Sequence, residues 1–419
     1  MFGSSDDNKF ELTQQDKALL QQTIITKDSP GPILHDFQVL LDYVQEHEPE
    51  VTKTHQLSMK TLQPINSRLT HPIQHNLSRP TQKSLPNVAG LYLILRASGL
   101  AFIDTSGKKS KLKLNEYVHS SWQTLNPTER YFTLLESWLL RGSEELLGES
   151  HRSFFGFHHP LTQWLYFQGR LKVPNWPDKA QNLADELKYL PGLHNLALME
   201  SFGLIAIESE GPAEKGGWWI TAVEPTQYGI TLLGLLAEKV LKASNILLEF
   251  EGPAQIIPGQ LQPFLQPYFP QWQNNIQWPE TTFRSGTYVF QVSLSKSVWR
   301  RIAIDADMEL EVLGAVILGA FDFDNDHLHR FIYRSHLGTS QDVNHPYMDE
   351  GPFTSEVRVG DVPLSVGGTM DFNFDFGDNW YFEVKLESVE EGGEVLERPK
   401  ILESHGQAPE QYPSYGDEW

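Results

Sequence analysis

The sequence predicts an α+β protein, in which a C-terminal antiparallel sheet with one packed helix follows a mainly helical, winged-helix-like region. Apolar and polar residues alternate with a period of two over 288–294 and again over 372–386, as in half-buried strands. Between these stretches, residues 308–320 hold apolar side chains at helical spacing. Apolar residues also recur at helical spacing over 126–139, which predicts the helical part of the chain.

The N-terminal segment, 1–87, has two parts with different chemistry. Residues 10–47 carry two apolar helical stripes, and Pro30-Gly31-Pro32 separates them because proline and glycine interrupt helices. Residues 51–87 are rich in proline and in small polar residues. We therefore expect two short helices, followed by a solvated linker that runs into a surface hairpin.

Basic residues are concentrated between Val51 and Asn115, where ten Lys or Arg residues accompany a single acid, Asp104. Such a charge run usually forms a solvated surface. It also supports an alternative, in which this segment, 51–115, contacts nucleic acid or an acidic partner. The candidate nucleic-acid contacts lie in the predicted hairpin and are Lys108, Lys109, Lys111 and Lys113.

The middle segment, 88–250, predicts a helical, winged-helix-like domain. Over 183–237 the order helix, strand, loop, strand, helix is typical of a winged helix. The helix that would enter DNA, 193–202, contains no Lys or Arg, whereas helices that read DNA need such donors for phosphates and base edges. We therefore expect a packing or interaction role for this helix, with DNA reading as the alternative.

Two further features of this half of the chain are predicted. A helix begins at Asn126, where Pro127 suits the first helical position and Glu129 completes a capping box. Six prolines among Gln and aromatic residues mark 251–283 as a connector. Its aromatic side chains predict that the connector packs against the protein through Phe264, Tyr268, Phe269 and Trp272.

The last segment, 284–419, predicts an α+β domain. Asp305 and Asp307 offer N-cap oxygens to its helix. Gly377-Asp378-Asn379 predicts a three-residue hairpin loop. The expected elements are strands over 288–294, 298–304, 328–333, 372–376 and 380–386, and a helix over 308–320.

Asp, His, Arg and Trp residues of this last segment form the candidate site. Its His and Asp side chains would hold a metal ion if their strands are neighbours. The simpler interpretation, which we adopt, assigns no metal: Asp326 and Asp378 cap turns, and Arg300 or Arg301 pairs with one of the acids. The candidate binding residues are Arg300, Arg301, Asp326, His327, His329, Asp375, Asp378 and Trp380.

No catalytic signature accompanies these residues. Asp375-Phe376-Gly377 has the letters of a kinase magnesium motif, but the glycine-rich and catalytic loops of kinases are missing. Asp322, Asp324 and Asp326 have calcium-loop spacing, yet His327 occupies the glycine position of such a loop. Zinc-protease, nucleophile-elbow, P-loop and dinucleotide motifs are absent from the sequence. The sequence therefore names no catalytic residue and leaves open whether the protein is an enzyme.

Three motifs in order carry a family resemblance: Trp299-Arg300-Arg301 after a strand, Asp326-His327-Leu328 with Phe331, and Asp375-Phe376-Gly377-Asp378 with Trp380. With the proline-containing end, they make 284–412 similar to the plasmid pRiA4b ORF-3-like family, also described as insertion-element passenger proteins of TnpR type. The resemblance implies an α+β fold and an association with mobile elements. It implies no established activity, so it supplies no catalytic residues and no cofactor. Many members carry cysteine near the end, where this chain has none, which argues against a thiolate metal site.

Charge and cysteine content narrow the class of protein. The net charge is −21, and 284–419 holds ten basic and 25 acidic residues, or −15. This acidity disfavours contact of the C-terminal segment with nucleic acid or anionic membranes. The absence of cysteine, the acidic N-terminus and the short longest apolar run, 312–321, predict a cytoplasmic protein without membrane contact.

Three hypotheses for function follow from the sequence. The first is a cytoplasmic multidomain interaction protein with a protein partner, in a mobile-element or defence context. The second is a nucleic-acid-binding protein that uses 51–115. The third is a metal-dependent enzyme centred on His327 and Asp378.

Overall fold

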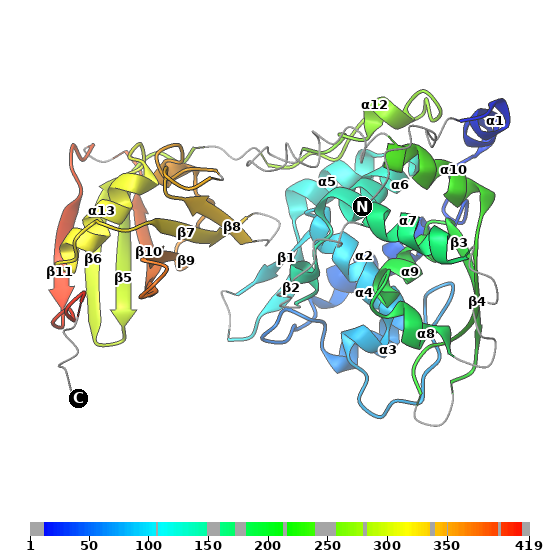
Figure 1. Ribbon diagram of the computed structural model, residues 1–419, viewed down its shortest axis with the longest axis horizontal. Coiled ribbons are helices and arrows are strands. Elements are labelled where there is room, and N and C mark those ends of the chain that lie inside the picture. The colour runs from blue at the N-terminus through cyan, green and yellow to red at the C-terminus, as the bar shows by residue number, and fades with distance from the viewer. Residues whose placement is uncertain are drawn as a thin grey trace, which may run out of the picture. The chain divides into compact units, whose positions relative to one another are not determined.

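The chain divides into two compact units (Figure 1). Unit 1 comprises Met1–Glu249 with Gln255–Pro279, and unit 2 comprises Phe250–Ala254 with Glu280–Trp419. The computed structural model describes residues 12–105, 108–148, 160–171, 182–212, 216–238, 257–279, 283–335, 340–349, 351–392 and 395–412. Across these residues, no helix combines the length and the apolar character needed to cross a membrane.

Unit 1 is built around α4 (Pro86–Ala97), a helix in which all residues but one are buried. A helix that is apolar on every side is stable only when protein encloses it. α4 packs closely on α9 (Leu193–Ser201), because a Cβ atom at Gly90 would lie 2.7 Å from Leu198 Cγ. The other helices of this unit are α1 (Gln14–Gln22), α2 (Ile33–His47), α3 (Met59–Asn66), α5 (Glu116–Thr124), α6 (Pro127–Glu136), α7 (Pro160–Leu171), α8 (Leu183–Leu187), α10 (Gln227–Leu236) and α12 (Gln262–Leu265).

Residues 51–87 belong to this core, so the prediction of a solvated linker is wrong. The segment forms α3 and then folds back, since the Asn66 side chain donates to the Ile73 carbonyl at 2.9 Å and accepts from the Ile73 N–H at 3.0 Å. The prolines interrupt regular structure without preventing burial. The buried apolar side chains of the segment are Leu57, Leu62, Ile65, Leu69, Ile73 and Leu85.

Two hairpins complete unit 1. The predicted surface hairpin is present as β1 (Ala101–Asp104) paired with β2 (Lys111–Leu114). β3 (Ile205–Glu210) pairs with β4 (Trp219–Pro225), between α9 and α10. The order of elements over 183–237 therefore agrees with the predicted pattern, and the winged-helix interpretation itself stays a prediction.

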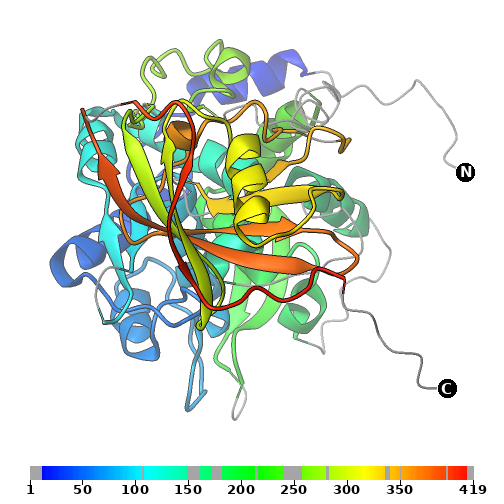
Figure 2. The same cartoon turned by 90° about the vertical axis from the view of Figure 1, so that its left-hand side faces the viewer.

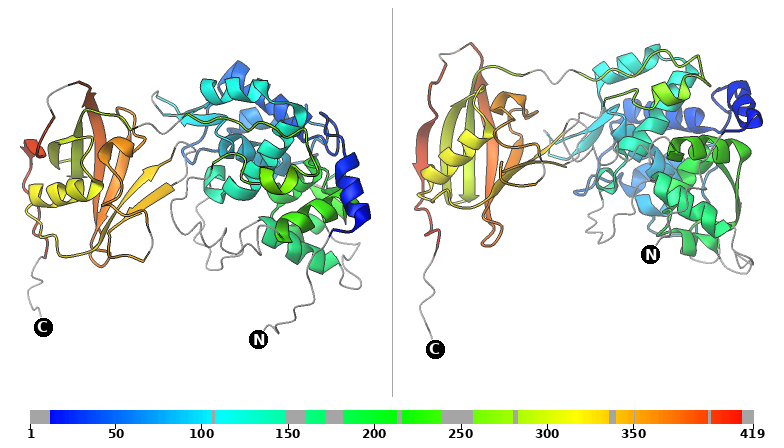
Figure 3. Two further views of the ribbon diagram at one scale, coloured as in Figure 1. Left: turned by 90° about the horizontal axis from the view of Figure 1, so that it is seen from above. Right: turned by 45° about the horizontal axis from the view of Figure 1, so that its top comes forward.

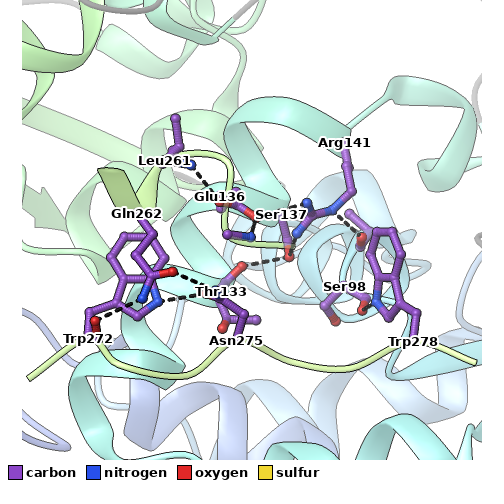
Figure 4. Close-up of polar contacts among 12 residues, drawn as sticks. Ser98, Thr133, Glu136, Ser137, Arg141, Leu261, Gln262, Trp272, Asn275 and Trp278 are labelled. Atoms are coloured by element: carbon purple, nitrogen blue, oxygen red, sulfur yellow. Dashed lines mark hydrogen bonds and ion pairs between the residues drawn. The ribbon is translucent and has the colours of Figure 1, made fainter. Parts of the chain in front are cut away.

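A strap, residues 257–279, lies along α6 and is held by two buried glutamates of that helix, Glu129 and Glu136. Figure 4 shows the contacts of Glu136. Glu129 closes the predicted capping box, because its carboxylate accepts from the Asn126 N–H at 2.8 Å. The same carboxylate accepts from the backbone N–H of Asn274 at 2.7 Å. Glu136 accepts from the N–H groups of Gly259 at 2.8 Å and Leu261 at 2.9 Å. The buried apolar side chains of the strap are Leu261, Leu265, Phe269, Trp272 and Ile276.

Glu136 also forms a buried ion pair with Arg141, which lies on a π-helical turn, η2 (Ser137–Arg141). The Arg141 Nη1 atom is 3.2 Å from Glu136 Oε1, and both side chains are only 1% exposed. Arg141 donates further to the Ser137 hydroxyl and the Ala97 carbonyl, so its donors are used within the core. Its guanidinium lies over the Trp278 ring, which extends the contact to the end of the strap (Figure 4).

Unit 2 contains a seven-stranded sheet of order β11-β6-β5-β10-β9-β7-β8, in which all neighbouring strands are antiparallel. One helix, α13 (Leu310–Ala320), lies on one face of this sheet (Figures 2 and 3). The α+β fold with a packed helix is therefore confirmed. The strands are β5 (Thr287–Ser295), β6 (Val298–Asp305), β7 (His329–Arg334), β8 (Ser340–Asn344), β9 (Thr369–Phe374), β10 (Trp380–Glu390) and β11 (Lys400–His405).

The alternation in the sequence decides which side chains face α13. Phe372 and Phe374 of β9 and Phe382 and Val384 of β10 are fully buried in the core. The intervening residues of β10, Tyr381, Glu383 and Lys385, are exposed. Aromatic side chains fill much of this core, and removing one such ring typically costs about 3–5 kcal/mol.

The structure differs from the predicted details of unit 2 in three places. The N-cap of α13 is Glu309, and the Asp305 carboxylate instead accepts from the Asp307 N–H at 3.0 Å. The hairpin loop spans 375–379, because Trp380 pairs with Phe374. The edge strands β8 and β11 are not predicted, since neither stretch alternates clearly in the sequence.

Candidate functional site

The eight candidate residues of unit 2 do not form one site. Arg300 is buried and donates to the carbonyl oxygens of Ala320 at 2.7 Å and His405 at 3.0 Å. Its guanidinium also lies over the Phe321 ring, 4.5 Å from the ring centroid. The expectation that Arg300 or Arg301 pairs with one of these acids is therefore not met by Arg300. Arg300 joins the end of α13 to the end of β11.

Arg301 does pair with acids, but not with those of the candidate cluster. Its Nε atom is 2.6 Å from Glu387 Oε2, and its Nη1 atom is 3.7 Å from Glu403 Oε2. Arg301 lies in β6, which forms a hairpin with β5. Glu387 belongs to β10 and Glu403 to β11, the two strands that flank this hairpin, so Arg301 links both of them. Its role in the structure is to tie the sheet together.

His329 is enclosed by protein. Its Nε2 atom is 3.3 Å from the Thr354 hydroxyl, and its ring meets the His345 ring edge-on at 4.6 Å. Burial, with the nearby His345, lowers the pKa of His329 to about 4. A buried imidazole of this kind is not accessible to a binding partner at the surface, and His329 belongs to no group of three possible metal ligands among the described residues.

His327 and Asp375 lie together in the loops at one end of the sheet. His327 is exposed, and its Nε2 atom is 3.6 Å from Asp375 Oδ2. Asp375 also accepts from the Gly377 N–H at 2.9 Å, in a left-handed conformation with φ of 53°. The turn is thus capped by Asp375 rather than by Asp378, whose side chain is exposed.

Trp380 follows this turn and packs in the core. Its ring meets the Phe323 ring edge-on at 4.8 Å, beside the loop that leaves α13. Its indole Nε1 atom is buried and has no hydrogen-bond partner among the described residues. These contacts make Trp380 a packing residue at the end of β10.

Asp326 holds the C-terminal end of the described chain instead of capping a turn. Its carboxylate accepts from the Tyr412 hydroxyl at 2.8 Å and from Gln411 Nε2 at 3.3 Å. Gln411 also accepts from the Asp324 N–H at 2.6 Å. Desolvation and the Asp326 carboxylate raise the pKa of Tyr412 to about 12. The acidic loop therefore anchors residues 411 and 412.

These positions do not assemble the metal site that His327, His329, Asp326, Asp375 and Asp378 suggest. Carboxylate oxygens and imidazole nitrogens must converge within about 2–2.6 Å of an ion. Over the described ranges, no group of three or more His, Asp or Glu residues is placed to hold a metal ion.

The lysines of the β1–β2 hairpin contact two acids that precede the basic segment, Glu48 and Glu50, and the one acid within it, Asp104. The Lys109 ammonium is 3.0 Å from Glu50, and the Lys111 ammonium is 3.2 Å from Glu48. Lys113 lies 2.8 Å from Asp104. Lys108 is exposed on the same hairpin. The positive charge predicted for this surface is therefore partly neutralised by the acids after α2.

The helix that would read DNA is enclosed in unit 1. α9 buries Asn195, Leu196, Ala197, Leu198 and Met199. A helix that enters a major groove needs an exposed face with donors for phosphates and base edges. The packing role expected for residues 193–202 fits this burial.

A group of exposed and partly exposed side chains that the sequence interpretation overlooked lies on the face of the sheet opposite α13. We call it the Arg330 patch. Its central residue, Arg330 of β7, is 3.1 Å from Asp342 of β8 and lies 5.4 Å from the Phe376 ring centroid. Phe376 is 42% exposed and Tyr381 is 45% exposed. The Arg330 patch consists of Arg330, Asp342, Asp371, Phe376 and Tyr381.

Two further contacts join the side chains of the patch. Tyr381 of β10 hydrogen-bonds with Asp371 of β9, and the charge of Arg330 acts on Tyr381. Burial raises the pKa of Asp371, while the Tyr381 hydroxyl partly offsets that rise. Burial, followed by the nearby Asp371, raises the pKa of Tyr381. The signal available in the sequence was the polar face of 380–386, because period-two alternation places Tyr381 outward.

The chain was compared with solved structures, curated proteins and protein families. Among solved structures, the crystal structure of a protein of unknown function from Methanosarcina mazei Go1 has 23% sequence identity to this chain, with a TM-score of 0.26. That match covers 30% of this chain and 73% of the other. None of the curated proteins matches the chain. The family model described as plasmid pRiA4b ORF-3-like protein matches residues 287–412. The similarity of the C-terminal part of this chain to that family, which its motifs suggested, is therefore confirmed over residues 287–412.

Proposed function

We propose that this protein is a multidomain interaction protein and that the Arg330 patch binds a protein partner. The observation that carries this proposal is the grouping of an arginine, a tyrosine and a phenylalanine, all accessible, on adjoining strands. Tyr and Arg are strongly enriched among the residues that dominate binding energy at protein interfaces. A sheet face also presents such side chains with little loss of conformational freedom on binding.

Contacts within the patch support this role. The Arg330 guanidinium contacts two side chains: it forms an ion pair with Asp342 and lies over the Phe376 ring. The arginine is therefore oriented before a partner binds. Tyr381 is oriented in the same way by Asp371. Preorganised side chains lose less entropy on association, and this loss is about 0.5–1.5 kcal/mol for each side chain that must be ordered.

The test is a pull-down from native lysate with the full chain as bait. We expect specific partners to be recovered, and the double substitution Arg330→Ala with Tyr381→Ala to reduce recovery at least tenfold, because hot-spot residues contribute about 2 kcal/mol or more each. Lys385→Ala is the matched control, since Lys385 is exposed on the same face of β10 outside the patch.

Two results would contradict the proposal. One is recovery of nothing above background. The other is equal recovery by the double variant and the wild type, with both chains shown to be folded by circular dichroism. Loss of binding in the Lys385→Ala control as well would point to a general effect on the sheet face rather than to the patch.

The nucleic-acid hypothesis has weaker support, because Glu48, Glu50 and Asp104 pair with the hairpin lysines. We expect no gel shift with mixed duplex DNA at low salt, where phosphate contacts are strongest. A shift that weakens steeply with salt would revive this hypothesis. The charge-reversal variant Lys109→Glu should then abolish it.

The metal-enzyme hypothesis lacks a converging ligand set in the described residues. Elemental analysis of purified protein tests it directly, and we expect no stoichiometric metal. The absence of cysteine is consistent with a cytoplasmic setting for the proposed interaction. The family match supports a mobile-element or defence context, which stays part of this proposal.

A further inference from the structure

β11 is an anchored strand that buries none of its own side chains. It lies at one edge of the seven-stranded sheet (Figure 1), and all six of its residues are exposed. Ile401 is 50% exposed and Leu402 is 53% exposed. Among the described strands, only β6 pairs with it, so its outer edge presents unpaired backbone groups.

β11 is held to the sheet by side chains of β6, although its own side chains are not buried. The buried Arg300 donates to the carbonyl oxygens of His405 at 3.0 Å and Gly406 at 3.2 Å. The His405 ring stacks on the Trp299 ring at 5.3 Å. The fold therefore fixes in place a strand whose own side chains lie outside the hydrophobic core, and the unpaired N–H and C=O groups of such an edge are a template for a further strand.

We propose that β11 pairs with β11 of a second copy of this chain, in an antiparallel arrangement about a two-fold axis. A two-fold interface requires a surface that is complementary to itself. The bulge at Leu402 brings Lys400 and Glu403 onto one face of β11, because they pair with Ala303 and Arg301 of β6. With this bulge, a two-fold axis between Ile401 and Leu402 places each of these two residues opposite the other in the second copy. It also places Lys400 of each copy opposite Glu403 of the other. All four central residues thus meet a partner of matching chemistry.

The same argument disfavours an unrelated partner strand. A strand that binds an unrelated sequence has no need to be complementary to itself. β11 is complementary to itself in both its charged pair, Lys400 with Glu403, and its apolar pair, Ile401 with Leu402. Opposite charges facing each other across strands contribute about 0.2–1 kcal/mol per pair. Glu403 remains available for this contact because its side chain is 54% exposed despite its distance of 3.7 Å from Arg301.

The expected dimer is weak. A single pair of six-residue strands buries far less than the roughly 1,600 Å² of a standard interface. A bulge at Leu402, which β11 omits from its register with β6, also perturbs the edge, and natural edges use bulges to resist pairing. The dimer should therefore be populated only at high protein concentration.

Sedimentation equilibrium of the full chain tests the proposal between about 1 and about 500 µM, a range that covers weak association. We expect a reversible monomer–dimer equilibrium. Lys400→Glu and Glu403→Lys, made singly, each place like charges opposite one another twice and should weaken dimerisation at least tenfold. The double swap Lys400→Glu with Glu403→Lys restores complementarity and should recover most of the lost affinity.

A monomer at every concentration overturns the proposal, as does a dimer that the single reversals leave unchanged. Hydrogen exchange on the wild-type chain gives a second measurement that needs no variant. The amides of 400–405 should exchange more slowly at high than at low concentration, and equal rates would also overturn the proposal. The Arg330 patch lies on other strands, so the pull-down and the sedimentation results can succeed or fail independently.

Discussion

Replacing Glu136 with alanine should lower the free energy of unfolding of unit 1 by about 3–5 kcal/mol, the usual cost of removing one partner from a buried ion pair. Arg141 would remain in the core without its carboxylate, and burial already lowers the pKa of its guanidinium. The N–H groups of Gly259 and Leu261 would lose their acceptor as well. Urea unfolding followed by tryptophan fluorescence measures the change, since Trp272 and Trp278 report on the strap.

The control for this prediction is the double variant Glu136→Gln with Arg141→Met. Replacing both partners of a buried pair with neutral side chains is often far less damaging than removing one. We therefore expect this variant to be more stable than Glu136→Ala. Hydrogen exchange should locate the damage of the single variant in 257–279 and leave unit 2 unchanged. Two results would contradict the assigned role of Glu136. One is a Glu136→Ala variant as stable as the wild type, and the other is faster hydrogen exchange of that variant in unit 2 alone.

Unit 2 should lose about 3 kcal/mol of stability through His329 as the pH falls from about 6.5 to about 4. The folded state keeps this imidazole neutral, with a pKa of about 4, whereas an unfolded histidine titrates near 6.5. Above pH 6.5 both states are neutral and the residue adds no pH dependence. Below it the unfolded state binds a proton that the folded state does not, so stability decreases until the pH reaches the folded pKa.

The measurement is the urea midpoint of unit 2 as a function of pH, for the wild type and for His329→Gln. Glutamine can still reach the Thr354 hydroxyl but carries no titrating group, so the variant should have a flatter profile between pH 6.5 and 4. His405→Gln changes an exposed histidine of the same unit and controls for the replacement of a histidine by glutamine. If the urea midpoints of the wild type and His329→Gln change with pH in parallel, a group other than His329 causes the loss of stability. Carboxylates contribute equally to all three chains and cancel in the comparison.

Local features were predicted well because their causes lie within a few residues. The capping box at Asn126 and Glu129 is a short-range exchange of hydrogen bonds, and the structure contains it as expected. The hairpin of β9 and β10 follows from alternating Phe side chains that can be buried only on one face. The helix over 310–320 follows from its apolar periodicity, although its N-cap is Glu309 rather than an aspartate.

Predictions failed where the partner of a side chain lies far away in the chain. Arg300 or Arg301 was expected to pair with one of the candidate acids, yet the acceptors of Arg300 are carbonyl groups of α13 and β11. The basic segment appeared uncompensated because Glu48 and Glu50 precede it in the sequence, although they lie beside its lysines in space. Residues 51–87 were taken as a linker from their prolines, while their apolar side chains are enclosed by the rest of unit 1.

The sequence by itself determined the α+β class, the alternation of the central strands and the similarity of residues 287–412 to a known family. These depend on periodicity and on motifs, which a linear chain displays directly. Only the tertiary structure decided which charged groups meet, because guanidinium and carboxylate partners are chosen by three-dimensional proximity. The tertiary structure also showed that the predicted cluster is not one site: Arg300 anchors β11, His329 is buried, and Asp375 caps a turn. It also assembled the Arg330 patch from β7, β8, β9, β10 and the β9–β10 turn, and placed β11 at the edge of the sheet.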